Sequence, residues 1–184
     1  MTRPYRTIYC DVDGVLADFV GGVRRAMALP EDWQPRQWDI NADTLLTGRE
    51  AECDAALREP GFCEDLHAYN GSVYQIQQLR QLRPVTFLTS PLSNAPCWIS
   101  ERRLWLEQRF PYADVIFEKD KAKYARHGVS STSDVGAVLI DDSDAHCEAW
   151  RKAGGTAYLV ARPWNSGSGG NLQHVLELIK AGAK

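Results

Sequence analysis

The sequence predicts an α/β fold, a doubly wound parallel sheet with a small helical cap inserted after the first strand. Short apolar and β-branched runs alternate with segments of helical periodicity along most of the 184 residues, and this alternation is typical of parallel sheets. The stretch from residue 19 to about residue 71 departs from the alternation, because it shows no strand periodicity. We therefore expect a core of residues 1–18 and 72–184 and a cap of residues 19–71.

The first expected strand runs from Thr7 to Val12, and Gly14 ends it. Side chains two residues apart in an extended chain point the same way, so Asp11 and Asp13 can face one spot at the strand tip. In open α/β sheets this tip is where ligands bind. Two carboxylates so close repel each other unless a cation or a shared proton relieves them. Taken alone, however, the Asp-Val-Asp-Gly stretch fits a solvated turn equally well.

The cap should contain helices only. A short helix is expected through Val23 to Ala28, and Pro30 should end it. Further along, the run from Leu45 to Leu57 has helical periodicity.

Two helices and one strand should follow the cap. The first helix opens at Asn70-Gly71-Ser72 and ends before Pro84, and it carries an apolar stripe at three-residue spacing: Val73, Ile76, Leu79 and Leu82. The second expected strand is Val85 to Leu88, and a helix from Trp98 to Phe110 is closed by Pro111.

The last third of the chain should supply three strands and two helices. Val115 to Phe117 is a short strand, and Val135 to Ile140 is almost continuously apolar, as expected of a strand buried on both faces. Ser143-Asp144 can cap a helix that ends at Gly154. The remaining elements are a strand over Thr156 to Val160 and a terminal helix that opens at Asn171.

Composition narrows the class of protein. The net charge of −3 argues against a general nucleic-acid-binding surface. No apolar run has the length of a membrane span, and the segment Met1-Thr2-Arg3-Pro4 lacks the apolar stretch of a signal peptide. The five cysteines include no C-x-x-C pair, so neither a disulfide framework nor a zinc site is indicated. We expect a cytoplasmic protein without membrane association.

Four stretches, in this order, resemble the motifs of the haloacid dehalogenase (HAD) superfamily of phosphotransferases. They are Asp11-x-Asp13-Gly14-Val15-x-Ala17-Asp18, Phe87-Leu88-Thr89-Ser90-Pro91, a lysine near Lys121, and Leu139-Ile140-Asp141-Asp142. Asp-Gly-Val-Leu-Ala-Asp-Phe followed by Gly-Gly, and the later Thr-Ser-Pro, are most similar to the 5'(3')-deoxyribonucleotidase family. The resemblance spans roughly Thr7 to Asn165, is weak between about Arg24 and Leu57, and implies a Rossmann-like HAD core.

The resemblance implies hydrolysis of phosphomonoesters through an aspartyl-phosphate intermediate. Asp11 would be the nucleophile, and Asp13 would protonate the leaving oxygen and later activate water. A Mg²⁺ ion would be held by Asp11, the backbone carbonyl of Asp13 and a late acidic residue, either Asp141 or Asp142. Four converging carboxylates also suit this hard, oxygen-preferring cation.

The phosphate itself should be held by hydroxyl groups and cations. Thr89 and Ser90 can bind phosphate oxygens without adding charge, although an ordinary turn before Pro91 is the alternative. By resemblance, Lys121 neutralises the nucleophile and the phosphate, and Lys119 takes the position of a family arginine. Arg102 falls where relatives carry a phosphate-contacting lysine, and an exposed helical arginine explains it equally well.

Aromatic residues of the cap should contact the leaving group. Phe19 has a counterpart in the family, where aromatic side chains sandwich the base. Trp38 and Phe62 lie in regions similar to further aromatic contacts, but packing in the core is an equal alternative for both. The segment from Arg162 to Asn165 resembles a family loop, and we expect it to support the site. The four histidines lack metal-ligand spacing and receive no role.

These observations favour a Mg²⁺-dependent nucleotidase that acts on (deoxy)ribonucleoside monophosphates. One alternative is a HAD phosphatase for another small phosphomonoester or for a nucleic-acid end, and another is a non-catalytic nucleotide-binding protein of the same fold. We expect a small-molecule partner and no stable nucleic-acid partner. Self-association into a homodimer, the base and sugar preference and the choice between 5' and 3' phosphates stay open.

Overall fold

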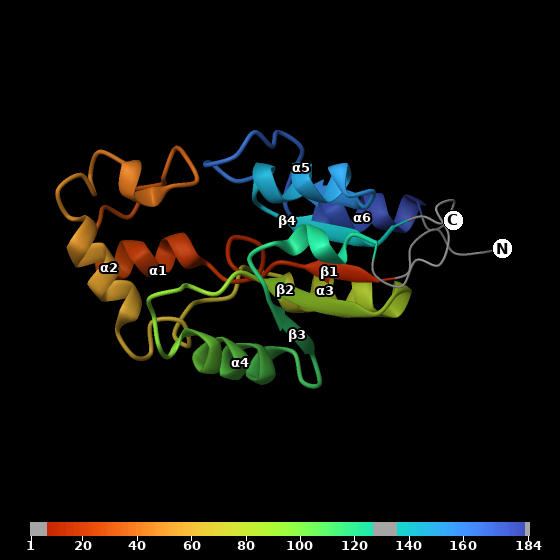
Figure 1. The fold of residues 1–184 in the computed structure, drawn as a ribbon, viewed down its shortest axis with the longest axis horizontal. Coiled ribbons are helices and arrows are strands. Elements are labelled where there is room, and N and C mark those ends of the chain that lie inside the picture. The colour runs from red at the N-terminus through yellow and green to blue at the C-terminus, as the bar shows by residue number, and fades with distance from the viewer. Residues whose placement is uncertain (1–6, 127–135, 183–184) are drawn as a thin grey trace.

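Five strands form one parallel sheet in the computed structural model, which describes residues 7–126 and 136–182. The order across the sheet is β3-β2-β1-β4-β5 (Figure 1). The strands are β1 (Ile8–Cys10), β2 (Val85–Thr89), β3 (Asp114–Phe117), β4 (Val138–Asp141) and β5 (Thr156–Leu159). The predicted doubly wound parallel sheet is therefore confirmed.

β1 lies at the centre of the sheet and is fully covered. It pairs with β2 on one side and with β4 on the other, so Cys10 is level with both Phe87 and Ile140. The chain thus leaves β1 toward one edge of the sheet and later returns to its other side. Such a reversal of strand order creates a crevice at the carboxyl ends of the strands, where open α/β sheets bind ligands.

Helices cover both faces of the sheet. Ile8 and Cys10 point into a hydrophobic cluster shared with α3 (Ser72–Leu82), α4 (Trp98–Arg109) and α6 (Leu172–Gly182). Tyr9, between them in sequence, points into the opposite cluster with α5 (Asp144–Lys152). This alternation along β1 is what a strand buried on both faces requires.

A group of helices lies beyond the carboxyl ends of the strands, and we call residues 19–58 the helical insert (Figure 1). The insert contains α1 (Phe19–Ala26), a short 3₁₀ helix η1 (Ile40–Ala42) and α2 (Glu50–Arg58). Its apolar side chains form a separate cluster, whose buried members from the insert are Val20, Val23, Met27, Trp33, Leu46, Cys53 and Leu57. The all-helical character predicted for this region agrees with the structure, while the domain boundaries at residues 18/19 and 71/72 stay predictions.

The predicted element boundaries differ from the observed ones in a few places. α1 begins at Phe19, because the Asp18 carboxylate accepts a hydrogen bond from the Gly21 N–H at 2.9 Å and caps the helix. α2 begins only at Glu50, after Gly48, which has a left-handed φ of +79°. The strand expected over residues 135–140 is β4, and Val135 lies outside the described residues.

Two short 3₁₀ helices, η1 and η2 (Lys121–Tyr124), were not predicted. Each is a single turn, which is too short for hydrophobic periodicity to reveal.

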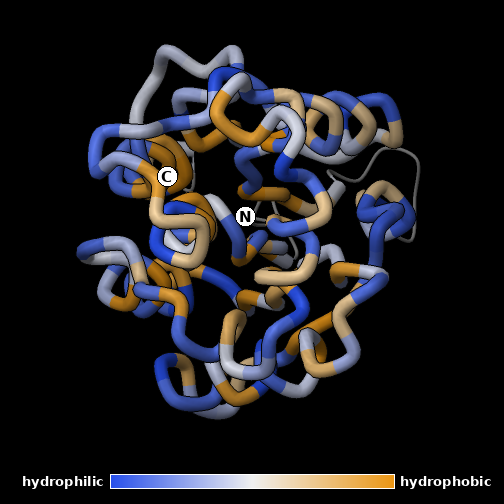
Figure 2. The backbone as a smooth tube through the Cα atoms, turned by 90° about the vertical axis from the view of Figure 1, so that its left-hand side faces the viewer, coloured by the Kyte–Doolittle hydropathy of each residue, from blue (hydrophilic) through white to orange (hydrophobic). Residues whose placement is uncertain are grey.

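Hydrophobic and hydrophilic residues alternate around the helices when the molecule is viewed from the insert (Figure 2). This pattern is typical of amphipathic helices that pack on a core. Among the described residues, no helix combines the length and the hydropathy needed to span a bilayer.

Candidate active site

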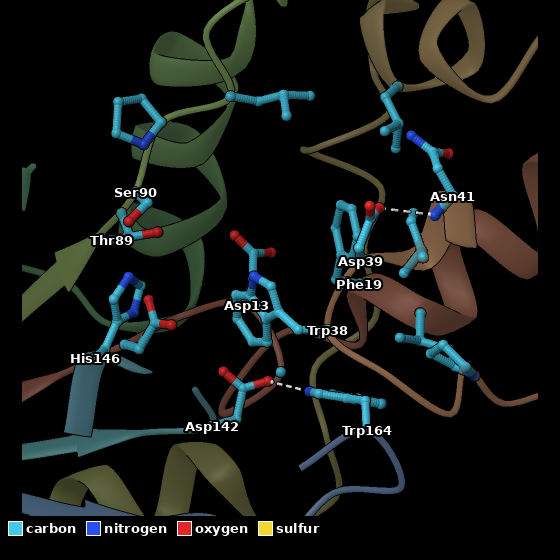
Figure 3. A pocket seen from close by; sticks show the side chains of 18 of the residues that line it. Asp13, Phe19, Trp38, Asp39, Asn41, Thr89, Ser90, Asp142, His146 and Trp164 are labelled. Carbon is cyan, nitrogen blue, oxygen red and sulfur yellow. Dashed lines mark hydrogen bonds between the residues drawn. The ribbon is translucent and has the colours of Figure 1, made fainter. Parts of the chain in front are cut away.

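A pocket of about 480 Å³ lies at the carboxyl ends of the central strands, beneath the helical insert. Its floor consists of side chains at or just after the ends of β1, β2 and β4, namely Asp11, Asp13, Thr89, Ser90 and Asp142. Its opposite wall comes from the insert and includes Phe19, Trp38, Asp39 and Asn41 (Figure 3). The pocket therefore occupies the crevice that the strand order creates.

Three carboxylates converge at the carboxyl ends of β1 and β4, and two of them, Asp11 and Asp142, line the pocket. Asp11 follows β1 directly, Asp141 ends β4, and Asp142 follows it. Each offers an oxygen within 4.8 Å of the others, and all three residues are buried. The parallel pairing of β1 with β4 brings these residues together, as the sequence predicted.

Lys121 holds two of these carboxylates. Its Nζ lies 2.9 Å from Asp11 Oδ1 and 2.7 Å from Asp141 Oδ2, and only 2% of the residue is exposed. η2 places this side chain beside the central strands. One ammonium group against three carboxylates leaves an excess of negative charge in a buried space, which is costly without a further cation.

The acid strengths of the three carboxyl groups reflect this excess. Burial raises the pKa of Asp11 to about 6, although Lys121 opposes the shift. Burial and the neighbouring Asp11 and Asp141 charges raise the pKa of Asp142 well above its usual range. Despite its burial, Asp141 has a lowered pKa, because Lys121 and His146 stabilise its charge.

These residues fit a divalent cation. Oδ1 of Asp142 is buried and has no hydrogen-bond partner, although a buried carboxylate oxygen normally has one. Hard cations such as Mg²⁺ take carboxylate oxygens as ligands and supply the missing positive charge. Asp11, Asp141 and Asp142 therefore form a candidate metal site, and a coordinated ion would satisfy the unpartnered oxygen.

Asp13 lines the same pocket but faces a different partner. Its Oδ1 lies 2.5 Å from Nη2 of Arg102, and its side chain does not belong to the three-carboxylate group. Burial raises the pKa of Asp13, and Arg102 opposes this shift. A metal contact through the Asp13 side chain is thus not supported, which leaves the predicted contact through its backbone carbonyl.

Arg102 is fully buried, so the alternative of an exposed helical arginine is wrong. Its guanidinium lies over the rings of Trp98 and Trp105, at 5.3 and 5.4 Å from their centroids. Arg102 does not belong to the wall of the pocket, and its described ion pair is with Asp13. The structure therefore places it behind Asp13, and its predicted phosphate contact stays a prediction.

Thr89 ends β2 at the pocket, and Ser90 follows it (Figure 3). Thr89 is 1% exposed, and its buried Oγ1 has no partner within the protein. The Ser90 hydroxyl donates to the carbonyl of Glu118 at 3.4 Å. The Thr89 hydroxyl is thus available to bind a ligand. If Thr89 only stabilised an ordinary turn, its hydroxyl would be expected to bond to a backbone group of that turn.

The predicted substrate contacts divide into two groups. Phe19 and Trp38 line the pocket, and 54% of Trp38 is exposed. Phe62 packs against Phe19 and Trp98 instead of lining the pocket, so the core-packing alternative holds for it. Lys119 is exposed, hydrogen-bonds to the Ser93 hydroxyl and lies outside the pocket wall, so a substrate contact is not supported.

Sequence reasoning missed several residues of the pocket wall. His146 lies in the first turn of α5, and its Nδ1 is 3.3 Å from Asp141 Oδ1, while its ring contacts Trp38. Its position in the first turn of the helix that directly follows Asp141 and Asp142 is a signal that could have identified it. Trp98 and Asn41 also line the pocket, and no motif pointed to either.

The segment that follows β5 contacts the site through three side chains. Trp164 Nε1 donates to Asp142 Oδ2 at 2.9 Å, and Asn165 Nδ2 donates to the Asp142 carbonyl at 2.8 Å. Arg162 Nε donates to the carbonyl of Gly14 at 2.5 Å. These contacts agree with the supporting role expected for this segment.

Comparisons with known proteins indicate the same fold. No protein-family model matches the chain. The chain is 28% identical, over 158 residues, to the cytosolic type of 5'(3')-deoxyribonucleotidase from Homo sapiens. The aligned region covers 78% of this chain and 73% of that protein.

Solved structures of HAD hydrolases superpose on almost the whole chain. A Bacillus subtilis protein described as a HAD-hydrolase, YfnB, in a magnesium-bound form, has a TM-score of 0.64 at 16% identity, covering 97% of this chain and all of that one. A HAD family hydrolase from Deinococcus radiodurans R1, with bound phosphate and sodium, has a TM-score of 0.57 at 15% identity, covering 96% and 89%. The chain thus has the HAD hydrolase fold, and the resemblance found in the sequence is confirmed.

We predict that Asp11→Asn stabilises the metal-free protein at neutral pH. A carboxyl whose pKa is raised by folding, here from 3.8 to about 6, favours the folded state only when protonated, so stability falls as pH rises between these values. At pH 7.5 in EDTA the variant should gain about 1–3 kcal/mol in the free energy of unfolding over the wild type. Near pH 4 the difference should vanish.

Urea unfolding at both pH values checks this, and Asp32→Asn, at an exposed aspartate, is the control. A wild-type protein more stable than Asp11→Asn at pH 7.5 would contradict the predicted electrostatic strain.

A second prediction concerns Gly14, over which the Asp142 carboxylate lies. A Cβ at Gly14 would sit 1.9 Å from Asp142 Oδ2, whereas a Cβ at Gly48 would meet nothing within 4 Å. Both glycines have left-handed φ angles, +74° and +79°, so alanine costs about 1–2 kcal/mol of backbone strain at either position. Only Gly14→Ala should also displace Asp142 and weaken Mg²⁺ binding, by about tenfold or more.

Isothermal titration of both variants with Mg²⁺ measures the difference. Equal affinities for Gly14→Ala and Gly48→Ala would show that the placement of Asp142 does not matter for the ion.

Proposed function

We propose that the protein is a Mg²⁺-dependent phosphomonoesterase that hydrolyses (deoxy)ribonucleoside monophosphates. One observation carries this proposal: Lys121 and Asp141 lie behind two further buried carboxylates, Asp11 and Asp142, which line the same pocket as Thr89, whose hydroxyl has no partner. The identity with a 5'(3')-deoxyribonucleotidase supports the substrate class, and the cytosolic type of that relative supports a cytoplasmic location.

The cation would be held by Asp11, by the backbone carbonyl of Asp13 and by Asp141 or Asp142. When bound, Mg²⁺ offsets the negative charge of the phosphoryl oxygens and of the carboxylates around them. The unpartnered Oδ1 of Asp142 makes this residue the better candidate for direct contact, because both oxygens of Asp141 already have partners.

Asp11 is the proposed nucleophile. Lys121 holds its Oδ1 at 2.9 Å, so the second oxygen is the one to attack phosphorus. As the new phosphorus–oxygen bond forms, the ester bond breaks and the leaving oxygen takes a proton from Asp13. Water then attacks the aspartyl-phosphate, Asp13 accepts a proton from it, and the bond to Asp11 breaks to release inorganic phosphate.

Asp13 is suited to this acid and base role by its surroundings. Burial raises its pKa, which favours the protonated acid needed for the first step. Arg102 stabilises the carboxylate left after proton donation, because its guanidinium contacts Asp13 Oδ1. The same contact fixes the direction of the side chain toward the pocket.

The pocket wall supports a flat leaving group. Phe19, Trp38 and Trp98 all line it, and aromatic side chains stack on nucleobases at about 1–3 kcal/mol each. Among the residues that the structure describes, no Lys or Arg lines the pocket. A substrate with one phosphate and an uncharged base therefore suits it better than one with a second anionic group.

We predict Mg²⁺-dependent release of phosphate from a panel of deoxyribo- and ribonucleoside monophosphates. Asp11→Asn should reduce the rate by about three orders of magnitude, because it removes the nucleophile. Release measured with and without EDTA, alongside an aryl phosphate and a 5'-phosphorylated oligonucleotide, ranks the substrate classes. Activity on the aryl phosphate alone would discard the nucleoside pocket, and folded protein inactive on every substrate would favour the non-catalytic alternative.

We further predict that Asp13→Asn separates the two chemical steps. An aryl leaving group departs without a proton, so the first step should survive with an aryl phosphate, whereas water attack should slow by about 10²–10⁴-fold. Rapid mixing should then show a burst of aryl alcohol equal to the enzyme concentration, followed by slow turnover. Equal loss of both steps, with no burst, would contradict the role assigned to Asp13.

A further inference from the structure

Trp164 connects the α/β core to the helical insert. The residue follows β5 in the core, and it is 9% exposed. Its ring packs in the hydrophobic cluster of the helical insert, together with Val23, Met27 and Leu46. Every other buried member of that cluster, within the part of the chain that the structure describes, lies between residues 20 and 57. The indole is thus contributed by the core to the hydrophobic cluster of the insert.

The polar edge of the same indole faces the candidate metal site. Its Nε1 donates to Asp142 Oδ2 at 2.9 Å, as the dashed line in Figure 3 shows. Oδ1 of Asp142 is left buried and unpartnered. A carboxylate with one oxygen tied to a donor cannot rotate freely, so this hydrogen bond determines which oxygen is presented to a cation.

The backbone around Trp164 is held by contacts that do not involve its ring. Asn165 Nδ2 donates to the carbonyls of Asp142 and Val160, at 2.8 and 2.9 Å. Arg162 Nε donates to the carbonyl of Gly14 at 2.5 Å. Removal of the indole N–H should therefore leave the segment in place and change only the hydrogen bond to Asp142.

We infer that Trp164 is a positioning residue that couples the packing of the helical insert to the affinity of the metal site. This inference rests on the proposed function, because it assumes that Asp142 binds the cation. A shift of the insert moves the Trp164 ring, and the ring carries the donor that orients Asp142. Such coupling is reciprocal, so a bound cation also favours the packed position of the insert, which forms the wall of the pocket.

The direct test compares Mg²⁺ binding by the wild type and Trp164→Phe, measured by isothermal titration without substrate. Phenylalanine retains an aromatic ring in the cluster but cannot donate to Asp142. We expect the dissociation constant for Mg²⁺ to rise about tenfold, in line with the loss of a group that orients a metal ligand. Unchanged Mg²⁺ affinity in Trp164→Phe would overturn the inference.

Leu46→Ala tests the coupling from a position outside the pocket. Leu46 is fully buried in the insert cluster and does not line the pocket, so its truncation disturbs Trp164 only through packing. The matched control is Ile179→Ala in α6, which is 1% exposed and belongs to the cluster of the sheet. Circular dichroism melting establishes that each variant folds, and Leu46→Val replaces Leu46→Ala if that variant does not melt cooperatively.

We expect weaker Mg²⁺ binding in the Leu46 variant, by about threefold or more, and unchanged binding in Ile179→Ala. Equal effects of the two would overturn the coupling. A wild type that binds no Mg²⁺ would instead defeat the metal site of the proposed function. If the wild type binds Mg²⁺ and releases phosphate, and Trp164→Phe binds Mg²⁺ with unchanged affinity, only the positioning role of Trp164 is defeated.

Discussion

The confinement of three carboxylates around one lysine is the constraint on which the site depends. Lys121 contacts both Asp11 and Asp141, yet the group of three buried carboxylates retains excess negative charge. A cluster of buried like charges lowers the stability of the folded state. Such clusters are therefore found mainly at functional sites. The sheet supplies the rigidity that holds these charges together, since β1 and β4 are paired and fully buried.

Much of the fold and of the pocket floor could be predicted, because both depend on local pattern. The apolar runs identified all five strands, and the rule that parallel strands end at one edge placed Asp11, Thr89 and Asp142 together. Element boundaries were less accurate where a cap or a left-handed glycine determined them, as at Asp18 and Gly48. Such features depend on one side chain or one dihedral angle, which periodicity does not report.

The side chains around the floor were harder to predict, because long-range packing decides their directions. Arg102 has the sequence context of an exposed helical residue, yet α4 turns it inward against Trp98 and Trp105. Lys119 and Lys121 are two residues apart in one charged run, and only Lys121 reaches the carboxylates. His146 entered the pocket because Ser143 caps α5 and sets its first turn beside Asp141.

The contacts of the segment after β5 affect the order in which the protein folds. Arg162 contacts Gly14, which is 148 positions away in the sequence, and Trp164 contacts Asp142. Contacts between such distant parts of a chain form late, because a long loop must close first. During synthesis Asp11, the proposed nucleophile, emerges before β5, but its surroundings stay unfinished until β5 has joined the sheet. The proposed site is in this way assembled only after the segment that follows β5 has been synthesised.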